Sequence, residues 1–156
     1  MIISKSPVRL SMGGGGTDLP SYYEKYGGFL MAAAIDKYVY IFLNKRFGNS
    51  IRLSYSKTEI VDNVEEIEHN IFRESLKLTE INKQIELVSV ADVVSNCGLG
   101  TSSAFTVALL NALFNYKRKY FSLEKLAESA LLKVFHAQIS PASPFQVEAG
   151  RFGYSW

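Results

Sequence analysis

The chain has 156 residues, a length typical of one domain. Its composition is 47% hydrophobic and 21% charged, which provides a sizeable core and argues against intrinsic disorder. The formal net charge of +2 is too small to indicate a nucleic-acid surface, because such surfaces need several clustered cations. The one dense basic run, at 117–119, follows a helical pattern and is expected to oppose the negative end of that helix dipole.

The single cysteine fits a reducing compartment, and the hydropathy pattern bears on secretion and membrane insertion. Cys97 is the only cysteine, so an intrachain disulfide is impossible and no cysteine-based metal site is expected. The first ten residues contain no apolar stretch long enough for a signal peptide, and no apolar run reaches membrane-spanning length. We therefore expect a soluble, cytoplasmic protein without a membrane partner.

The first part of the chain has β character. Strands are expected at 1–10, 29–35, 38–43, 51–55 and 59–61. Four consecutive glycines at 13–16 predict a loop after the first strand. The runs at 29–35 and 38–43 are interpreted as two paired strands of an antiparallel meander, with the alternating Tyr38, Tyr40 and Phe42 facing the core.

The pattern changes at residue 64, where apolar positions interleaved with glutamates predict an amphipathic helix to residue 78. A strand is expected at 85–90 and a helix at 101–116. Ser122 is a candidate N-cap for a helix at 123–135. His69 is expected to be solvated, and no function is assigned to it.

The strongest chemical signal is the loop SNCGLGTSSA at 95–104, between an expected strand and an expected helix. Glycines allow close backbone approach, and a helix N-terminus attracts anions, so the loop is a candidate phosphate site. A hydroxyl from Thr101, Ser102 or Ser103 could bind phosphate or ligate Mg²⁺. No lysine follows the second glycine, which excludes a Walker loop. The alternative is a glycine turn before a capped helix.

A second signal is the segment PVRLSMGGGGTDLP at 7–20. Consecutive glycines lose much conformational entropy on folding, which suggests that the backbone approaches a ligand closely. Arg9 is suited to phosphoryl charge, and Asp18 to sugar hydroxyls. Taken singly, Arg9 could form a surface ion pair and Asp18 could cap a turn.

Together the two segments resemble the paired signatures of the GHMP kinases, which include galactokinase, homoserine kinase, mevalonate kinase and phosphomevalonate kinase. Arg9 and Asp18 match the first signature in order and spacing, and 98–104 matches the second signature, a GLGSSA-type loop. The sequence at 14–28 is most similar to that of the branch that phosphorylates D-glycero-D-manno-heptose 7-phosphate. The resemblance runs from residue 1 to about Leu132.

This resemblance implies an α+β, two-layer N-terminal domain with a mixed or antiparallel sheet packed against helices. It implies ATP and Mg²⁺ as cofactors, a small sugar or sugar phosphate as substrate, and transfer of a phosphoryl group to a sugar hydroxyl. The implied nucleotide-binding residues are Asn96, Cys97, Gly98, Leu99, Gly100, Thr101, Ser102 and Ser103, with Ser102 also a Mg²⁺ ligand. The implied substrate-binding residues are Gly14, Gly15, Gly16, Thr17 and Asp18, and the implied catalytic residue is Arg9.

The resemblance ends after Leu132. The family's metal-ligating Glu would fall near Val134, and residues 133–156 contain no Asp and one Glu, Glu148. We therefore interpret 1–132 as the nucleotide-binding domain and 133–156 as a divergent tail, and expect the second family domain to be absent. Frameshift, truncation and true divergence stay open as explanations.

Three function classes follow for the chain: a poorly active sugar kinase, a nucleotide-binding remnant without turnover, and a structural α/β domain. ATP binding separates the third class from the other two, and turnover separates the first from the second. Without the second domain, exposed apolar surface could support homo-oligomer formation.

Overall fold

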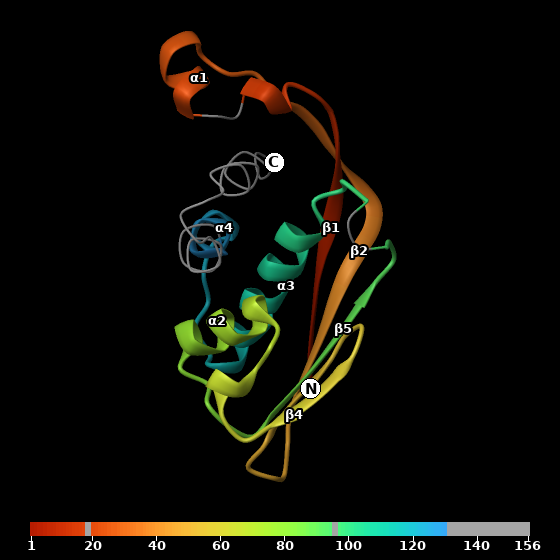
Figure 1. Cartoon of the computed structure of the whole chain (residues 1–156), viewed down its shortest axis with the longest axis vertical. Coiled ribbons are helices and arrows are strands. Elements are labelled where there is room, and N and C mark those ends of the chain that lie inside the picture. Colours follow the sequence, from red (N-terminus) through yellow and green to blue (C-terminus); the bar gives the residue numbers. More distant parts are fainter. Residues whose placement is uncertain (18–19, 95–96, 131–156) are drawn as a thin grey trace.

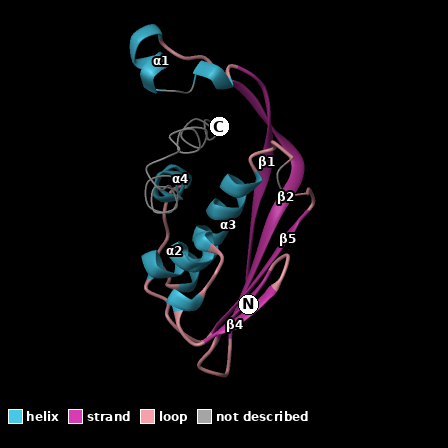
Figure 2. Ribbon diagram, in the orientation of Figure 1, coloured by secondary structure: helices cyan, strands magenta, loops and turns pink. Residues whose placement is uncertain are grey.

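A computed structural model describes residues 1–17, 20–94 and 97–130, and it contains a five-stranded mixed sheet (Figures 1 and 2). The strands are β1 (Ile2–Gly13), β2 (Met31–Lys45), β3 (Ile51–Ser54), β4 (Thr58–Val61) and β5 (Ile85–Ala91). Their order in the sheet is β1-β2-β5-β3-β4. All neighbouring pairs are antiparallel except β3 and β5, which are parallel.

Helices cover one face of this sheet (Figure 2). The α-helices are α1 (Pro20–Tyr26), α2 (Asn70–Thr79), α3 (Thr101–Tyr116) and α4 (Leu123–Ser129), and short 3-10 turns lie at Gly15–Thr17 and Val64–Glu66. Helix α3 packs on β1 and β2 and contacts α2, while α4 packs on α3 and α1 lies beyond the far end of β1 and β2 (Figure 1). The expected two-layer α+β fold is confirmed.

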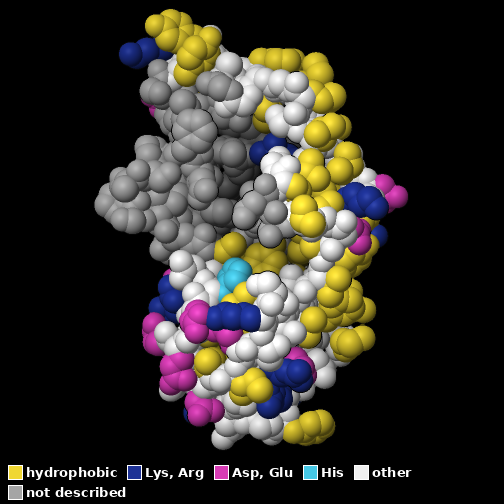
Figure 3. Space-filling model, turned by 45° about the vertical axis from the view of Figure 1, so that its right-hand side comes forward, with side chains coloured by type: hydrophobic (Ala, Val, Ile, Leu, Met, Phe, Trp, Pro, Cys, Tyr) yellow, Lys and Arg dark blue, Asp and Glu magenta, His cyan; other side chains and the backbone are white. Residues whose placement is uncertain are grey.

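The main core lies between α2, α3 and the sheet. Ile41, Ile51, Leu87 and Leu109 are 0% exposed there, which shows how completely the helices close the inner face. Among the described residues no helix covers the opposite face, where hydrophobic side chains gather along the sheet (Figure 3). Exposed hydrophobic side chains on the strands include Ile3, Leu10, Met12, Met31, Ile60 and Val90. Self-association through such a surface stays a prediction.

The expected antiparallel meander is wrong because β5 lies between β2 and β3. The chain forms the β3–β4 hairpin, crosses through α2 and returns as β5, parallel to β3. The apolar side chains Ile85 and Leu87 of β5 are fully buried, which suits a central strand paired on both sides. The strands expected at 51–55, 59–61 and 85–90 are confirmed as individual elements.

The two strands expected at 29–35 and 38–43 form one strand, β2, instead of a pair. A hairpin between them would need a turn, but Asp36 and Lys37 are not turn formers of the Asn-Gly or Asp-Gly kind. The long strand β1 pairs with β2 from Ile2 opposite Leu43 to Gly13 opposite Met31. A continuous partner strand therefore favours a continuous β2.

The core face of β2 is also the opposite of the one expected. Val39, Ile41 and Leu43 are at most 1% exposed beneath α3, whereas Tyr38, Tyr40 and Phe42 are half-buried on the other face. Aliphatic side chains fill the space under the helix, and the outer face leaves the Tyr40 hydroxyl within 3.5 Å of the Asp92 carboxylate.

The helix expected at 64–78 is interrupted by a hydrogen-bonded carboxylate. Glu59, only 7% exposed, accepts hydrogen bonds from the Tyr55 hydroxyl and from the Glu68 backbone N–H, the latter at 2.8 Å. Burial opposes its ionisation, but these bonds and the His69 backbone N–H lower the pKa of Glu59 below 4.5. Those two N–H groups are thereby withdrawn from the preceding turn, and α2 begins anew at Asn70.

The later helices agree with the pattern in the sequence. Helix α3 has the expected bounds, and the Ser122 side chain caps α4 by accepting a hydrogen bond from the Lys125 N–H at 3.3 Å. Lys117 donates to the Glu80 carbonyl at 3.1 Å, so this cation stabilises the C-terminus of α2, whereas the expectation concerned α3, the helix that it follows in the sequence. The rest of the helix expected to residue 135 lies outside the described residues, and α1 was not predicted.

Replacing Glu59 with Ala should lower the free energy of unfolding by about 2 kcal/mol, because the Tyr55 hydroxyl and the Glu68 N–H lose their acceptor. Urea unfolding followed by circular dichroism measures this. The control is Glu65→Ala, which removes an exposed carboxylate that pairs with Lys77 at 2.8 Å and should cost less than about 0.5 kcal/mol. Equal costs for the two variants would contradict the role given to Glu59.

Candidate functional site

The start of α3 is built for close approach by a ligand. Gly98 and Gly100 have φ angles of +76° and +70°, a region that side chains with a Cβ rarely adopt. Gly100 is the N-cap residue and has no side chain to bond the first N–H groups of α3. The helix therefore presents uncapped N–H groups and its positive dipole end at this loop.

Hydroxyl groups surround this helix start. Ser102 is exposed, while Thr101 and Ser103 are half-buried. The Cys97 thiol is exposed and lies 3.9 Å from the Thr101 hydroxyl. Deeper in the helix, the Ser102 backbone carbonyl accepts a hydrogen bond from the Thr106 hydroxyl at 2.8 Å.

Strand β1 brings Arg9 to the glycine loop. The Arg9 backbone N–H donates to the Leu99 carbonyl at 3.0 Å. The Arg9 side chain runs beside Gly100, since a Cβ built on that glycine would lie 3.4 Å from Arg9 Cγ and 3.5 Å from Nε. Two segments that lie far apart in the sequence therefore meet, and a guanidinium lies next to the helix N-terminus.

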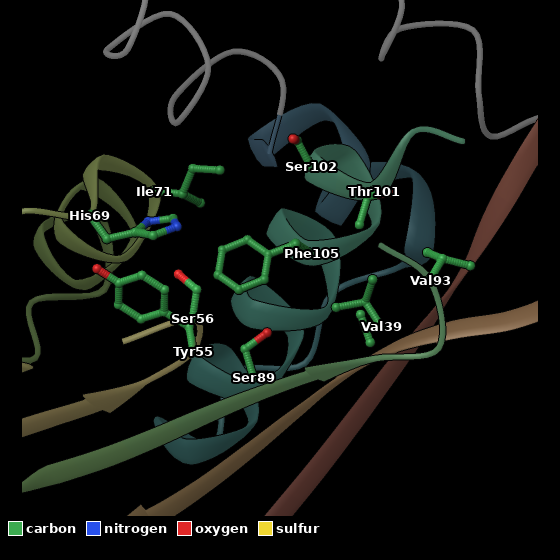
Figure 4. A pocket seen from close by; sticks show the side chains of 11 residues that line it. Val39, Tyr55, Ser56, His69, Ile71, Ser89, Val93, Thr101, Ser102 and Phe105 are labelled. Atoms are coloured by element: carbon green, nitrogen blue, oxygen red, sulfur yellow. The ribbon is translucent and has the colours of Figure 1, made fainter. Parts of the chain in front are cut away.

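A cavity of about 380 Å³ opens beside this junction (Figure 4). Its size falls within the usual range for small-molecule sites, roughly 300 to 1,000 Å³. It is lined by Val39, Tyr55, Ser56, His69, Ile71, Ser89, Ala91, Val93, Thr101, Ser102 and Phe105. The walls are thus largely aliphatic and aromatic, with a few hydroxyls and one imidazole, and no carboxylate is among the described lining residues.

His69 lies in the wall of this cavity, and the expectation of a solvated side chain is wrong. Its ring centroid is 4.8 Å from that of Tyr55, 5.0 Å from Phe72 and 5.5 Å from Phe105. Burial lowers the pKa of His69 below 6.5, and the nearby Lys57 charge adds to this, while its own backbone and the Glu59 charge oppose it. The ring is consequently neutral at physiological pH.

Tyr55 lies beside His69 in that wall (Figure 4). Burial raises the pKa of the Tyr55 hydroxyl, and its hydrogen bond to the Glu59 carboxylate raises it further. Tyr55 thus stays protonated and serves as a donor to Glu59. Glu59 accepts hydrogen bonds from Tyr55 and from the backbone just before α2, so both of its carboxylate oxygens have a donor behind the cavity wall.

The first glycine loop lies at the far end of β1 and β2, beyond the start of α3 (Figure 1). Gly15, Gly16 and Thr17 form its short 3-10 turn. The Thr17 hydroxyl accepts the Phe29 N–H at 3.0 Å and lies 2.7 Å from the Gly14 carbonyl oxygen, so it closes the loop internally. The predicted site residues Asp18 and Asn96 lie outside the described residues.

The described residues do not complete a magnesium site. Mg²⁺ is usually held by one or two carboxylates together with substrate phosphates. Within the described ranges no group of three or more His, Cys, Asp or Glu side chains could hold a metal ion. Ser102 at the start of α3 offers a hydroxyl without a carboxylate beside it in the cavity lining. Likewise, none of the described helices is long and apolar enough to cross a membrane.

Comparison with known families gives one match. Residues 58–141 match the family model for the GHMP kinases N terminal domain, a range that covers more than half of the chain. It includes the loop at 98–100 and the cavity wall at His69, and it does not include the first signature at 7–20. The predicted boundary at Leu132 stays a prediction, because its tail lies outside the described residues.

Individual relatives are similar over most of the chain. D-glycero-alpha-D-manno-heptose 7-phosphate kinase from Campylobacter jejuni is 29% identical over 81% of this chain and 42% of its own length. A D-glycero-D-manno-heptose 1-phosphate kinase from Bacteroides thetaiotaomicron superposes with a TM-score of 0.72 at 22% identity, over 87% of this chain and 49% of its own. The chain therefore spans less than half the length of the curated relative.

A third comparison concerns a structure with a bound nucleotide analogue. Streptococcus pneumoniae phosphomevalonate kinase in complex with phosphomevalonate and AMPPNP superposes with a TM-score of 0.63 at 20% identity. The match covers 85% of this chain and 43% of that protein. These structural likenesses confirm the fold expected from the two signatures.

Gly14 should tolerate no side chain, whereas its neighbour Gly15 should. Gly14 has a φ of +91°, and a Cβ there would lie 1.9 Å from the Phe29 carbonyl oxygen, while a Cβ on Gly15 meets nothing within 4 Å. We expect Gly14→Ala to open the loop and accelerate limited proteolysis between residues 13 and 30, and Gly15→Ala to leave it unchanged. Equal protease sensitivity of both variants would contradict this loop geometry.

Proposed function

The chain belongs to the GHMP kinase family, and on that basis we propose that it is the nucleotide-binding part of an ATP-dependent sugar or sugar-phosphate kinase. The observation that carries this proposal is the meeting of Arg9 and the glycine loop at the start of α3, where Thr101 and Ser102 line the cavity. A cation, uncapped N–H groups and hydroxyls together suit the phosphates of a nucleotide.

In this proposal the phosphates lie along Gly98 to Ser103, and the base enters the cavity between Ile71, Phe105 and Val39 (Figure 4). Apolar walls suit the faces of a purine, and the glycines let the phosphates approach the backbone closely. Guanine has two neighbouring N–H donors that a free carboxylate would accept. The described lining contains no carboxylate, so adenine fits this cavity better than guanine.

Arg9 is proposed to stabilise charge on the transferring phosphoryl group. Its side chain lies beside Gly100, so the guanidinium can reach an oxygen of a phosphate held at the α3 N-terminus. Mg²⁺, when bound with the nucleotide, would neutralise phosphate charge, with the Ser102 hydroxyl as its candidate protein ligand. The described residues supply no further ligand at that position.

We propose a seven-carbon sugar phosphate as the acceptor, held by the loop from Gly14 to Asp18. Support comes from the similarity to the heptose 7-phosphate kinase of C. jejuni over 81% of the chain. A nucleotide-binding protein without turnover is the second candidate function. The cavity lining favours it in one respect, because no described carboxylate is placed to orient an acceptor hydroxyl or to hold the metal.

Gly100→Val should abolish MgATP binding. The valine would have to adopt a φ of +70°, which strains any residue with a Cβ, and its methyl groups would occupy the space beside Arg9 that a phosphate needs. Isothermal titration calorimetry measures the affinity, and Gly48→Val at an open, exposed turn is the matched control. Unchanged ATP affinity in Gly100→Val would count decisively against a phosphate site at this loop.

Turnover by the 156-residue protein should be slow even where ATP binds. Loss of a single acid–base group costs about 10²- to 10⁴-fold, so we expect a rate at least about 100-fold below that of the C. jejuni relative, assayed in parallel with heptose 7-phosphate. A coupled assay for ADP release measures both. Comparable rates, abolished by Arg9→Ala, would show that this chain carries a complete catalytic site.

A further inference from the structure

We propose that the His69 imidazole makes the side-chain hydrogen bond that recognises the edge of the nucleotide base. This inference rests on the proposed function, because it requires the base to occupy the cavity beside α3. It adds a residue that determines base affinity and that lies well away from both glycine signatures in the sequence.

The first support is one ring nitrogen without a hydrogen-bond partner. His69 Nδ1 is buried and has no hydrogen-bond partner. Leaving such a group unpaired costs about 1 to 3 kcal/mol, and persistent examples in native proteins call for an explanation such as a ligand. Figure 4 shows the nitrogen-bearing end of the ring turned toward Ile71 and Phe105, on the side of the cavity.

The second support is that the ring is fixed in place. His69 is the N-cap of α2, with extended backbone angles of φ −74° and ψ 105°, and its ring meets Tyr55 and Phe72 edge-on. Glu59 holds the adjoining backbone through the Glu68 N–H. A ring packed in this way has few alternative orientations, and a preorganised polar group loses little entropy on binding.

The third support is the charge state. Burial and the Lys57 charge favour the neutral ring, and together they outweigh the Glu59 charge, which favours the protonated ring. The neighbouring Glu68 is ion-paired with Lys57. The Tyr55 hydroxyl is committed to Glu59. A neutral imidazole presents one donor and one acceptor, the same combination that the edge of a purine offers.

The remaining polar groups of the cavity are less suited to this role. Thr101 and Ser102 lie at the start of α3, where the phosphates are proposed to bind. Ser56 is exposed, and Ser89 is a half-buried residue of β5. The hydroxyl groups of both residues can bond water when no ligand is present. His69 is the polar lining side chain with a buried, unpaired atom in the described part of the chain.

The test compares ATP with inorganic tripolyphosphate, which carries the phosphates without a base, by calorimetry on the 156-residue protein. His69→Phe keeps an aromatic ring against Tyr55, Phe72 and Phe105 but removes both nitrogens. We expect it to weaken ATP binding about five- to tenfold and to leave tripolyphosphate binding within twofold. His69→Gln, which keeps a donor and an acceptor, should recover ATP affinity to within about threefold.

Equal ATP affinity in the wild-type protein and His69→Phe would overturn the inference. So would a parallel loss of ATP and tripolyphosphate binding, which would mean that the ring only supports the fold. If the wild-type protein bound neither compound, the proposed function itself would fail. If Gly100→Val abolished ATP binding and His69→Phe did not change it, the phosphate site would be supported. Only the role of His69 would then be rejected.

Discussion

The hydrogen bond from the Arg9 N–H to the Leu99 carbonyl fixes the glycine loop against β1, a strand at the edge of the sheet. With the loop held there, Gly100 can take its left-handed conformation and α3 can begin without a side-chain cap. The same contact places the Arg9 side chain beside the uncapped helix end. The proposed phosphate binding and charge stabilisation would thus depend on one backbone contact between segments far apart in the sequence.

The wall of the cavity depends on a second constraint, the buried carboxylate of Glu59. By accepting bonds from Tyr55 and from the backbone before α2, it ends the first short turn and starts the helix again at Asn70. That break turns His69 inward instead of leaving it on a solvated helix face. A structural carboxylate therefore sets the position of the imidazole that faces the proposed base.

Sequence reasoning succeeded where local chemistry decides the outcome. The glycine loop, the bounds of α3 and the Ser122 cap follow from backbone preferences that neighbouring residues determine. It failed where distant partners decide. The single strand β2 requires the long partner β1, and no local pattern reveals that β5 separates β2 from β3. The inward His69 likewise depends on Glu59, whose role no motif in the sequence indicates.

The central claim is that nucleotide phosphates bind at the start of α3 with the base in the adjoining cavity. Titration of MgATP into ¹⁵N-labelled protein, followed by NMR, tests it most directly. The account predicts the largest amide shift changes at Gly98, Gly100 and Ser102, with smaller changes at Arg9 and His69. Changes confined to the open face of the sheet, with none at Gly98 to Ser103, would contradict the account.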